Sequence, residues 1–217
     1  VIILPGPPGE LAPMFNESVR GFLKKYSDGA IVSHTVNIIG MGESSVAEEI
    51  EDMFDAKNPT VAPYAKSGEV RLRITAKAET ADEADKMCAP VVDEICSRLG
   101  DVVYGTDMNS IEERVVALLK EKGKKIATAE SCTAGYIPKR LTDIPGASEV
   151  FECGIVSYSN DIKTKLLGVS PKTLETYGAV SEQTAREMAL GAKRVSGADI
   201  AISTTGLAGP GGDGVLP

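Results

Sequence analysis

The second half of the chain alternates short apolar runs with amphipathic runs, and this alternation constrains the fold more than any other feature. The strand-like runs are residues 125–129, 154–158 and 198–205. A capping box at Ser110-Ile111-Glu112-Glu113 opens one helical pattern. Further helical patterns begin near Thr133, Ile162 and Ser181. Strands that alternate with helices are typical of an α/β layered domain.

Residues 27–105 repeat this mixture on a smaller scale. The pattern predicts strands over 30–39, 70–76 and 102–104 and helices over 45–54 and 80–99. Capping boxes at Ser45 and Thr80 open the two helices, and Pro90 should kink or interrupt the second. This order of elements predicts a small two-layer α/β domain.

The two ends of the chain suggest a piece of a longer protein. Val1-Ile2-Ile3-Leu4 has the composition of a buried strand, and a Pro-Gly turn and a helical pattern over 11–23 follow it. The last residues, 206–217, form a loop rich in Gly and Pro. We therefore expect three parts: a remnant over 1–26, a connecting domain over 27–105 and an incomplete domain over 110–217.

The charge of the chain excludes some functions. Its formal net charge is −8, from 23 basic and 31 acidic residues, which argues against direct binding to nucleic acid. The excess lies in residues 1–109, with 10 basic and 18 acidic side chains, whereas residues 110–217 hold 13 of each. No run approaches the ~18 apolar residues of a membrane helix. We expect no membrane contact.

Cysteine and histidine are scarce. The chain has one histidine, His34, and its four cysteines form no C-x-x-C pair. We therefore expect no Cys/His zinc site, no other metal and no cofactor. Since no basic-apolar leader opens the sequence, we expect a reduced, cytoplasmic setting.

The segment 127–135 is the first candidate for chemistry, because it lies where a strand becomes a helix. Ser131 would project from the end of the sheet, and N–H groups of the first helical turn would be free to bind an oxyanion. Ser131 or Thr133 can equally be a plain N-cap. Cys132 is a rival nucleophile, since a helix N-terminus lowers the pKa of a thiol.

A serine nucleophile needs a base, and residues 110–217 contain no histidine. A lysine with a lowered pKa can replace it, as in Ser-Lys hydrolases. Lys163 or Lys165 could serve, with Tyr158 as a hydrogen-bonding relay. A lysine in an amphipathic helix can equally be an ordinary surface residue.

The segment 205–214 is the third candidate. Its closely spaced glycines after a strand would let the backbone approach a phosphate. It is not a Walker loop, since no Gly-Lys-Ser/Thr follows, and it can equally be a simple connection.

Four segments, in this order, resemble the CinA C-terminal domain: Ala129-Glu130-Ser131-Cys132-Thr133; Tyr158-Ser159-Asn160 with Lys163 and Leu167-Gly168-Val169; Gly178-Ala179-Val180-Ser181-Glu182; and Thr205-Gly206-Leu207-Ala208-Gly209-Pro210-Gly211-Gly212. The resemblance implies deamidation of nicotinamide mononucleotide to nicotinic acid mononucleotide. It makes Ser131 the nucleophile, Lys163 the base and Tyr158 a relay. The substrate-binding residues it implies are Cys132, Thr133, Thr205, Gly206, Gly209, Gly211 and Gly212.

The opening Leu4-Pro5-Gly6-Pro7-Pro8 resembles the end of the molybdopterin-binding-like domain that precedes the CinA domain in two-domain CinA proteins. Residues 1–26 would then be its remnant. The partner implied is a pyridine mononucleotide, and a homodimer stays open. Two alternatives remain. One is a non-catalytic interaction protein of competence and DNA damage. The other is an ADP-ribose pyrophosphatase activity in the N-terminal domain.

Overall fold

The computed structural model describes residues 1–26, 28–66 and 68–207. The chain divides into two compact units, Val1–Met108 and Asn109–Pro217. Within the described residues no helix is long and apolar enough to cross a membrane.

The first residues differ from the prediction. Residues 1–4 form no strand, and Val1 and Ile3 are exposed. No described strand pairs with them, and an unpaired strand would leave its backbone groups without partners. The predicted helical pattern is present as α1 (Pro8–Met14), the π-helical turn η1 (Phe15–Val19) and α2 (Arg20–Lys24).

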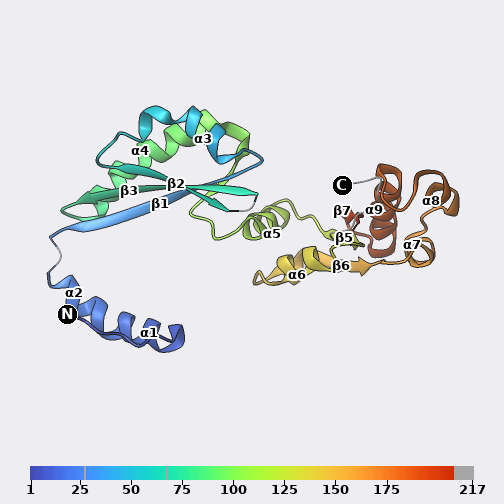
Figure 1. Ribbon diagram of the computed structural model, residues 1–217, viewed down its shortest axis with the longest axis horizontal. Coiled ribbons are helices and arrows are strands. Elements are labelled where there is room, and N and C mark those ends of the chain that lie inside the picture. Colours follow the sequence, from blue (N-terminus) through green and yellow to red (C-terminus); the bar gives the residue numbers. More distant parts are fainter. Residues whose placement is uncertain (27, 67, 208–217) are drawn as a thin grey trace. The chain divides into compact units, whose positions relative to one another are not determined.

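The rest of the first unit is one antiparallel sheet with helices on one face (Figure 1). The strands are β1 (Ala30–Ile39), β2 (Thr60–Lys66), β3 (Glu69–Ala78) and β4 (Val103–Thr106), in the order β2-β3-β1-β4. The helices are α3 (Glu43–Glu49), η2 (Glu51–Met53), α4 (Ala81–Leu99) and η3 (Gly100–Val102). The predicted two-layer α/β arrangement is confirmed.

The core of this unit follows the alternation in β3. Its apolar side chains face α4 and are fully or almost fully buried, and the helix buries a matching stripe: Val70, Leu72, Ile74, Ala76, Ala84, Cys88, Ile95 and Leu99. Side chains at alternate positions of a strand point to one face, so helices on one face are enough to cover them. The sheet therefore needs helices on only one of its two faces.

Three details of this unit differ from the sequence prediction. Strand β2 was not expected; it is an edge strand, which is where Pro63 is tolerated. Helix α3 begins at Glu43, so Ser45 is not its cap. Helix α4 runs through Pro90 without interruption, and Pro90 lies on its exposed side. The capping box at Thr80 is present.

His34 joins β1 to α4 and to the end of the unit. Its Nδ1 lies 2.6 Å from Asp107 Oδ2 and its Nε2 lies 2.8 Å from Asp85 Oδ1. These two hydrogen bonds, the one to Asp107 first, raise the pKa of His34. Asp107 has a φ of 54°, and its other oxygen accepts from the Thr35 amide at 2.7 Å.

The second unit contains a parallel sheet between two helical layers, so the predicted α/β fold is confirmed here too. Its elements in chain order are α5 (Ile111–Glu121), β5 (Ile126–Glu130), α6 (Tyr136–Thr142), η4 (Ala147–Glu149), β6 (Phe151–Val156), α7 (Asn160–Leu167), α8 (Pro171–Tyr177), α9 (Glu182–Ser196) and β7 (Ile200–Thr204). The strand order is β6-β5-β7. Helix α8 was not predicted.

Strand β5 is buried along its whole length because helices cover both of its faces. Ala127 and Ala129 pack in one cluster with Met188 and Ala192 of α9. Ile126 belongs to a second cluster, which includes side chains of α5 and α6. The chain leaves β5 toward β6 on one side and later returns as β7 on the other. In such sheets the carboxyl ends of the strands, at the point where the order reverses, are the usual place for a ligand.

Candidate active site

Ser131 directly follows β5 and lies at this edge of the sheet. Its amide donates to Thr204 O at 3.0 Å, which extends the pairing of β5 with β7 by one residue. Its side chain is almost entirely buried, with 6% exposed. The hydroxyl is thus carried by a backbone that is bonded to the end of β7.

Lys163 reaches the same point from α7. Ser159 caps this helix, since its hydroxyl accepts from the Ile162 amide at 3.3 Å, and Lys163 lies in the first turn after the cap. Only 1% of Lys163 is exposed. Its Nζ lies 3.0 Å from Ser131 Oγ, 2.9 Å from Ser157 O and 3.1 Å from Tyr158 O. The two residues predicted as nucleophile and base are therefore in hydrogen-bond contact.

The surroundings of Lys163 favour its neutral form. Burial lowers the pKa of the amine, and in the part of the chain that the structure describes no carboxylate pairs with it. The carbonyls of Ser157 and Tyr158 can only accept hydrogen bonds, so each takes one N–H of the amine. In the neutral amine the third position is a lone pair, and the remaining contact of Nζ is the Ser131 hydroxyl.

Lys165, the alternative base, is exposed. It lines a cavity of about 320 Å³ with Pro171 and Leu174. The structure thus brings one of the two candidate lysines to Ser131.

The residues after Ser131 form a turn, not the first turn of a helix as predicted. Helix α6 begins at Tyr136, because Ala134 and Gly135 adopt left-handed conformations with φ of 49° and 93°. The amides of residues 134, 135, 136 and 137 all have acceptors. Among the described residues, the amides of Cys132 and Thr133 have none. These two N–H groups are the free donors nearest to Ser131 along the chain.

The substrate-binding residues predicted around this turn lie near one another. Thr133 Oγ1 lies 2.6 Å from Thr204 Oγ1, which joins the turn to the end of β7. A Cβ placed on Gly206 would lie 3.1 Å from Cys132 Sγ, so the loop after β7 passes close to the turn. Thr205 donates its hydroxyl to Ala179 O at 2.7 Å. Gly209, Gly211 and Gly212 lie outside the described residues.

Tyr158 contacts Lys163 through its main-chain carbonyl. Its side chain is 68% exposed, and among the described residues its hydroxyl bonds to neither Lys163 nor Ser131. A relay through the phenol stays a prediction.

Glu130 is a member of this site to which the sequence had assigned no role. Its side chain is fully buried at the last position of β5. One oxygen, Oε2, accepts from the amides of Gly135 and Ile137 at 3.2 and 3.3 Å. In the sequence, this role is indicated by a charged residue at the end of a strand whose other residues are apolar or small.

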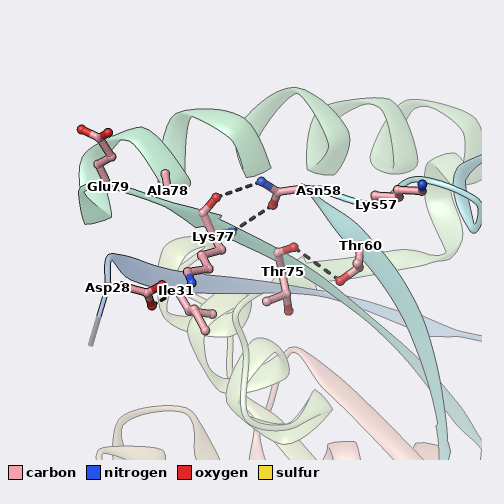
Figure 2. Close-up of a pocket in the computed structure, with 9 residues that line it drawn as sticks. All are labelled: Asp28, Ile31, Lys57, Asn58, Thr60, Thr75, Lys77, Ala78 and Glu79. Atoms are coloured by element: carbon pink, nitrogen blue, oxygen red, sulfur yellow. Dashed lines mark hydrogen bonds and ion pairs between the residues drawn. The ribbon is translucent and has the colours of Figure 1, made fainter. Parts of the chain in front are cut away.

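A cavity of about 580 Å³ lies in the first unit (Figure 2). Three of the residues that line it are joined by hydrogen bonds: the Asn58 side-chain amide bonds the backbone of Lys77 at 2.8 and 2.9 Å, and Lys77 Nζ pairs with Asp28 at 2.9 Å. The Asn58 side chain thus continues the hydrogen bonding of β3. None of the site residues predicted from the sequence lines this cavity, so we place the candidate site in the second unit.

The described residues contain no group of three or more His, Cys, Asp or Glu side chains that could hold a metal ion. The candidate site offers its own side chains and amides for chemistry. These are a serine, a buried lysine and two free N–H groups.

Fold and site together define an α/β protein with a serine–lysine pair at the carboxyl edge of a parallel sheet. The chain belongs to the CinA family: residues 108–215 match the CinA C-terminal domain, and residues 33–105 match the family described as the damage-inducible protein CinA KH domain.

Two sequence relatives agree with this assignment. A competence-damage inducible protein of Clostridium beijerinckii is 57% identical over 98% of this chain and 52% of its own length. A CinA-like protein of Desulfovibrio desulfuricans is 50% identical over 98% of this chain and 50% of its own length. The crystal structure of a CinA superfamily protein from Klebsiella pneumoniae is 36% identical, covering 49% of this chain and 68% of that one, with a TM-score of 0.48. The chain spans about half the length of the curated relatives it matches.

Proposed function

We propose that the second unit hydrolyses the carboxamide of nicotinamide mononucleotide to the acid and ammonia, with Ser131 as nucleophile and Lys163 as base. The observation that carries this proposal is the 3.0 Å contact between Lys163 Nζ and Ser131 Oγ inside a buried site. The substrate rests on the likeness of the four segments to the CinA C-terminal domain.

The reaction proceeds in two halves. The neutral amine of Lys163 takes the proton of the Ser131 hydroxyl as Oγ attacks the carboxamide carbon, and the C=O electrons move onto the oxygen. The tetrahedral intermediate collapses when its C–N bond breaks, and the Lys163 ammonium returns the proton to the leaving nitrogen, which departs as ammonia. Water then attacks the acyl ester, losing its proton to Lys163, and the acid is released as Ser131 regains a proton.

The amides of Cys132 and Thr133 are suited to hold the oxyanion, because both are unbonded among the described residues and follow the nucleophile directly. An amide is a poor electrophile, so such donors matter. Removing one typically costs about 3–4 kcal/mol of transition-state stabilisation. Neither group needs a side chain, so the site depends on the shape of the turn.

The test is ammonia release from nicotinamide mononucleotide by the full-length protein and by its Ser131→Ala variant. We expect the variant to lose activity by about a thousand-fold or more while its melting temperature stays close to that of the parent. The exposed Ser148 offers a matched control, since Ser148→Ala should change neither quantity. Full activity in Ser131→Ala would overturn the assignment.

A second measurement concerns the substrate. Nicotinamide riboside lacks the phosphate, so a phosphate-binding loop after β7 predicts a higher KM for the riboside than for the mononucleotide. Equal KM values would remove the phosphate from the proposal and leave the amide chemistry in place.

A further inference from the structure

Glu130 is buried in a way that fold stability alone does not explain. It is fully buried, and in the described part of the chain no cation pairs with it. Its Oε1 has no hydrogen-bond partner among the described residues, and neither has Thr128 Oγ1, two positions earlier on the same face of β5. A buried carboxylate with one oxygen unpaired is costly for folding. Such a residue needs a compensating role.

The hydrogen bonds of Glu130 hold both ends of the turn that carries the candidate nucleophile. Its main chain is held on both sides, in register with Val156 of β6 and Thr204 of β7. Its side chain reaches forward to the amides of Gly135 and Ile137, at the exit of the turn. The residues between these anchors are Ser131, Cys132, Thr133 and Ala134.

The backbone of this turn is strained, so an interaction must hold it in its conformation. Ala134 and Gly135 are consecutive residues with φ of 49° and 93°, and an alanine in the left-handed region is strained. Without the carboxylate, the Gly135 and Ile137 amides would lose their acceptor, and the backbone could relax toward an ordinary helical start. The Cys132 and Thr133 amides would then point elsewhere.

From these hydrogen bonds at both ends of the turn we propose that Glu130 is a positioning residue. It fixes the 131–135 turn so that the amides of Cys132 and Thr133 face the developing oxyanion. It does so through the two hydrogen bonds of Oε2. The inference rests on the proposed function, since it concerns the same site. It predicts that kcat depends more on the length of the side chain at position 130 and on the position of its accepting oxygen than on its negative charge.

Two conservative variants separate these contributions. Glu130→Gln keeps the length of the side chain and an oxygen that can accept from both amides, and it removes the negative charge. Glu130→Asp keeps the charge but is one methylene shorter, so it does not reach both amides. Thr128→Val is the matched control, because it alters a buried polar side chain on the same face without touching the turn.

We expect Glu130→Gln to retain kcat within about three-fold, whereas Glu130→Asp loses about ten- to a hundred-fold in kcat with little change in KM. Thr128→Val should keep kcat. The reverse order of the two Glu130 variants, equal losses in both, or no loss in either would overturn the proposal, as would a loss in Thr128→Val equal to that in Glu130→Asp. A melting curve for each variant checks that the variant is folded, so that the kcat values compared are those of folded proteins.

A second readout keeps this inference separate from the proposed substrate. A fluorophosphonate probe labels an activated serine, and its phosphoryl oxygen occupies the position of the oxyanion. If the parent labels at Ser131 but releases no ammonia from nicotinamide mononucleotide, the proposed substrate fails and the Glu130 inference is decided by labelling rates. Slow labelling in Glu130→Asp with near-parental labelling in Glu130→Gln supports it; equal rates in the two variants overturn it.

Discussion

Replacing Lys163 by methionine should abolish activity and at the same time change how stability depends on pH. Methionine has a similar length and fills the same buried space, but it has no proton to exchange. General-base catalysis typically contributes about 10²–10⁴-fold. We therefore expect kcat of Lys163→Met to fall by at least about a hundred-fold. Lys163→Arg should be equally inactive, because a guanidinium stays charged and cannot act as the base.

The stability effect follows from the lowered pKa of Lys163 in the folded protein. Between that lowered value and 10.5, the unfolded chain binds a proton on this amine that the folded chain does not. The free energy of unfolding therefore rises with pH in this window, by at most about 1.4 kcal/mol per pH unit for one group. Below the window both states hold the proton, and the cost of burying the ammonium is present in full. Lys163→Met removes this dependence.

The assay is urea unfolding of the parent and of Lys163→Met at a series of pH values. The difference in stability, variant minus parent, should be largest at low pH and should decline through the window. Four other groups have raised pKa values, which make the free energy of unfolding fall at high pH: Cys88, Cys96, Cys153 and Tyr104. Because the parent and the variant both contain these groups, their contribution cancels in the difference between the two proteins. A flat difference would mean that Lys163 is not perturbed, and retained activity would mean that another group is the base.

Three further predictions can be checked by thermal or urea unfolding. Ala134→Gly should stabilise the protein by about 0.5–1 kcal/mol, since Ala134 is exposed and has a left-handed φ of 49°; a loss of stability would contradict the strain argued here. Gly191→Ala should destabilise it by about 2 kcal/mol or more, because the new Cβ would lie 2.1 Å from Leu167 O, and a neutral effect would show that α9 is loosely packed. The raised pKa of His34 means that its two aspartate contacts stabilise the fold fully below about pH 6.5 and less as pH rises through the raised value. His34→Gln should remove that dependence, about 1 kcal/mol for two partly exposed pairs, and an unchanged pH profile would contradict it.

The pattern of apolar runs was enough to predict the α/β layers, because burial on one or two faces determines which positions are apolar. It also located Ser131 at a strand end and named Lys163 among two candidates. It could not choose between Lys163 and Lys165, because both lie on a short helix whose pattern does not show which side meets the sheet. In the structure it is Lys163 that contacts Ser131, a residue 32 positions earlier in the chain.

Other features were invisible for local reasons. The start of α6 depends on the left-handed φ of Ala134, and an alanine there reads as helical from sequence alone. Strand β2 contains Pro63, which lowers any strand signal, and only its edge position makes that proline acceptable. The role of Glu130 depends on amides five and seven residues further on, and no periodicity records such bonds.

The acceptors around Lys163 fit the role of base that we propose for it. A carboxylate beside Nζ would hold the amine in its charged form and so remove the base. The carbonyls of Ser157 and Tyr158 satisfy the hydrogen-bonding capacity of the amine without stabilising its charge as strongly as an anion would. Both carbonyls come from the backbone directly after β6, and Ser131 is held by the backbone of β7. The pairing of three strand ends thus builds the environment that a neutral lysine requires. For the same reason, a substitution that shifts the end of β6 should impair the base even where it touches neither Ser131 nor Lys163.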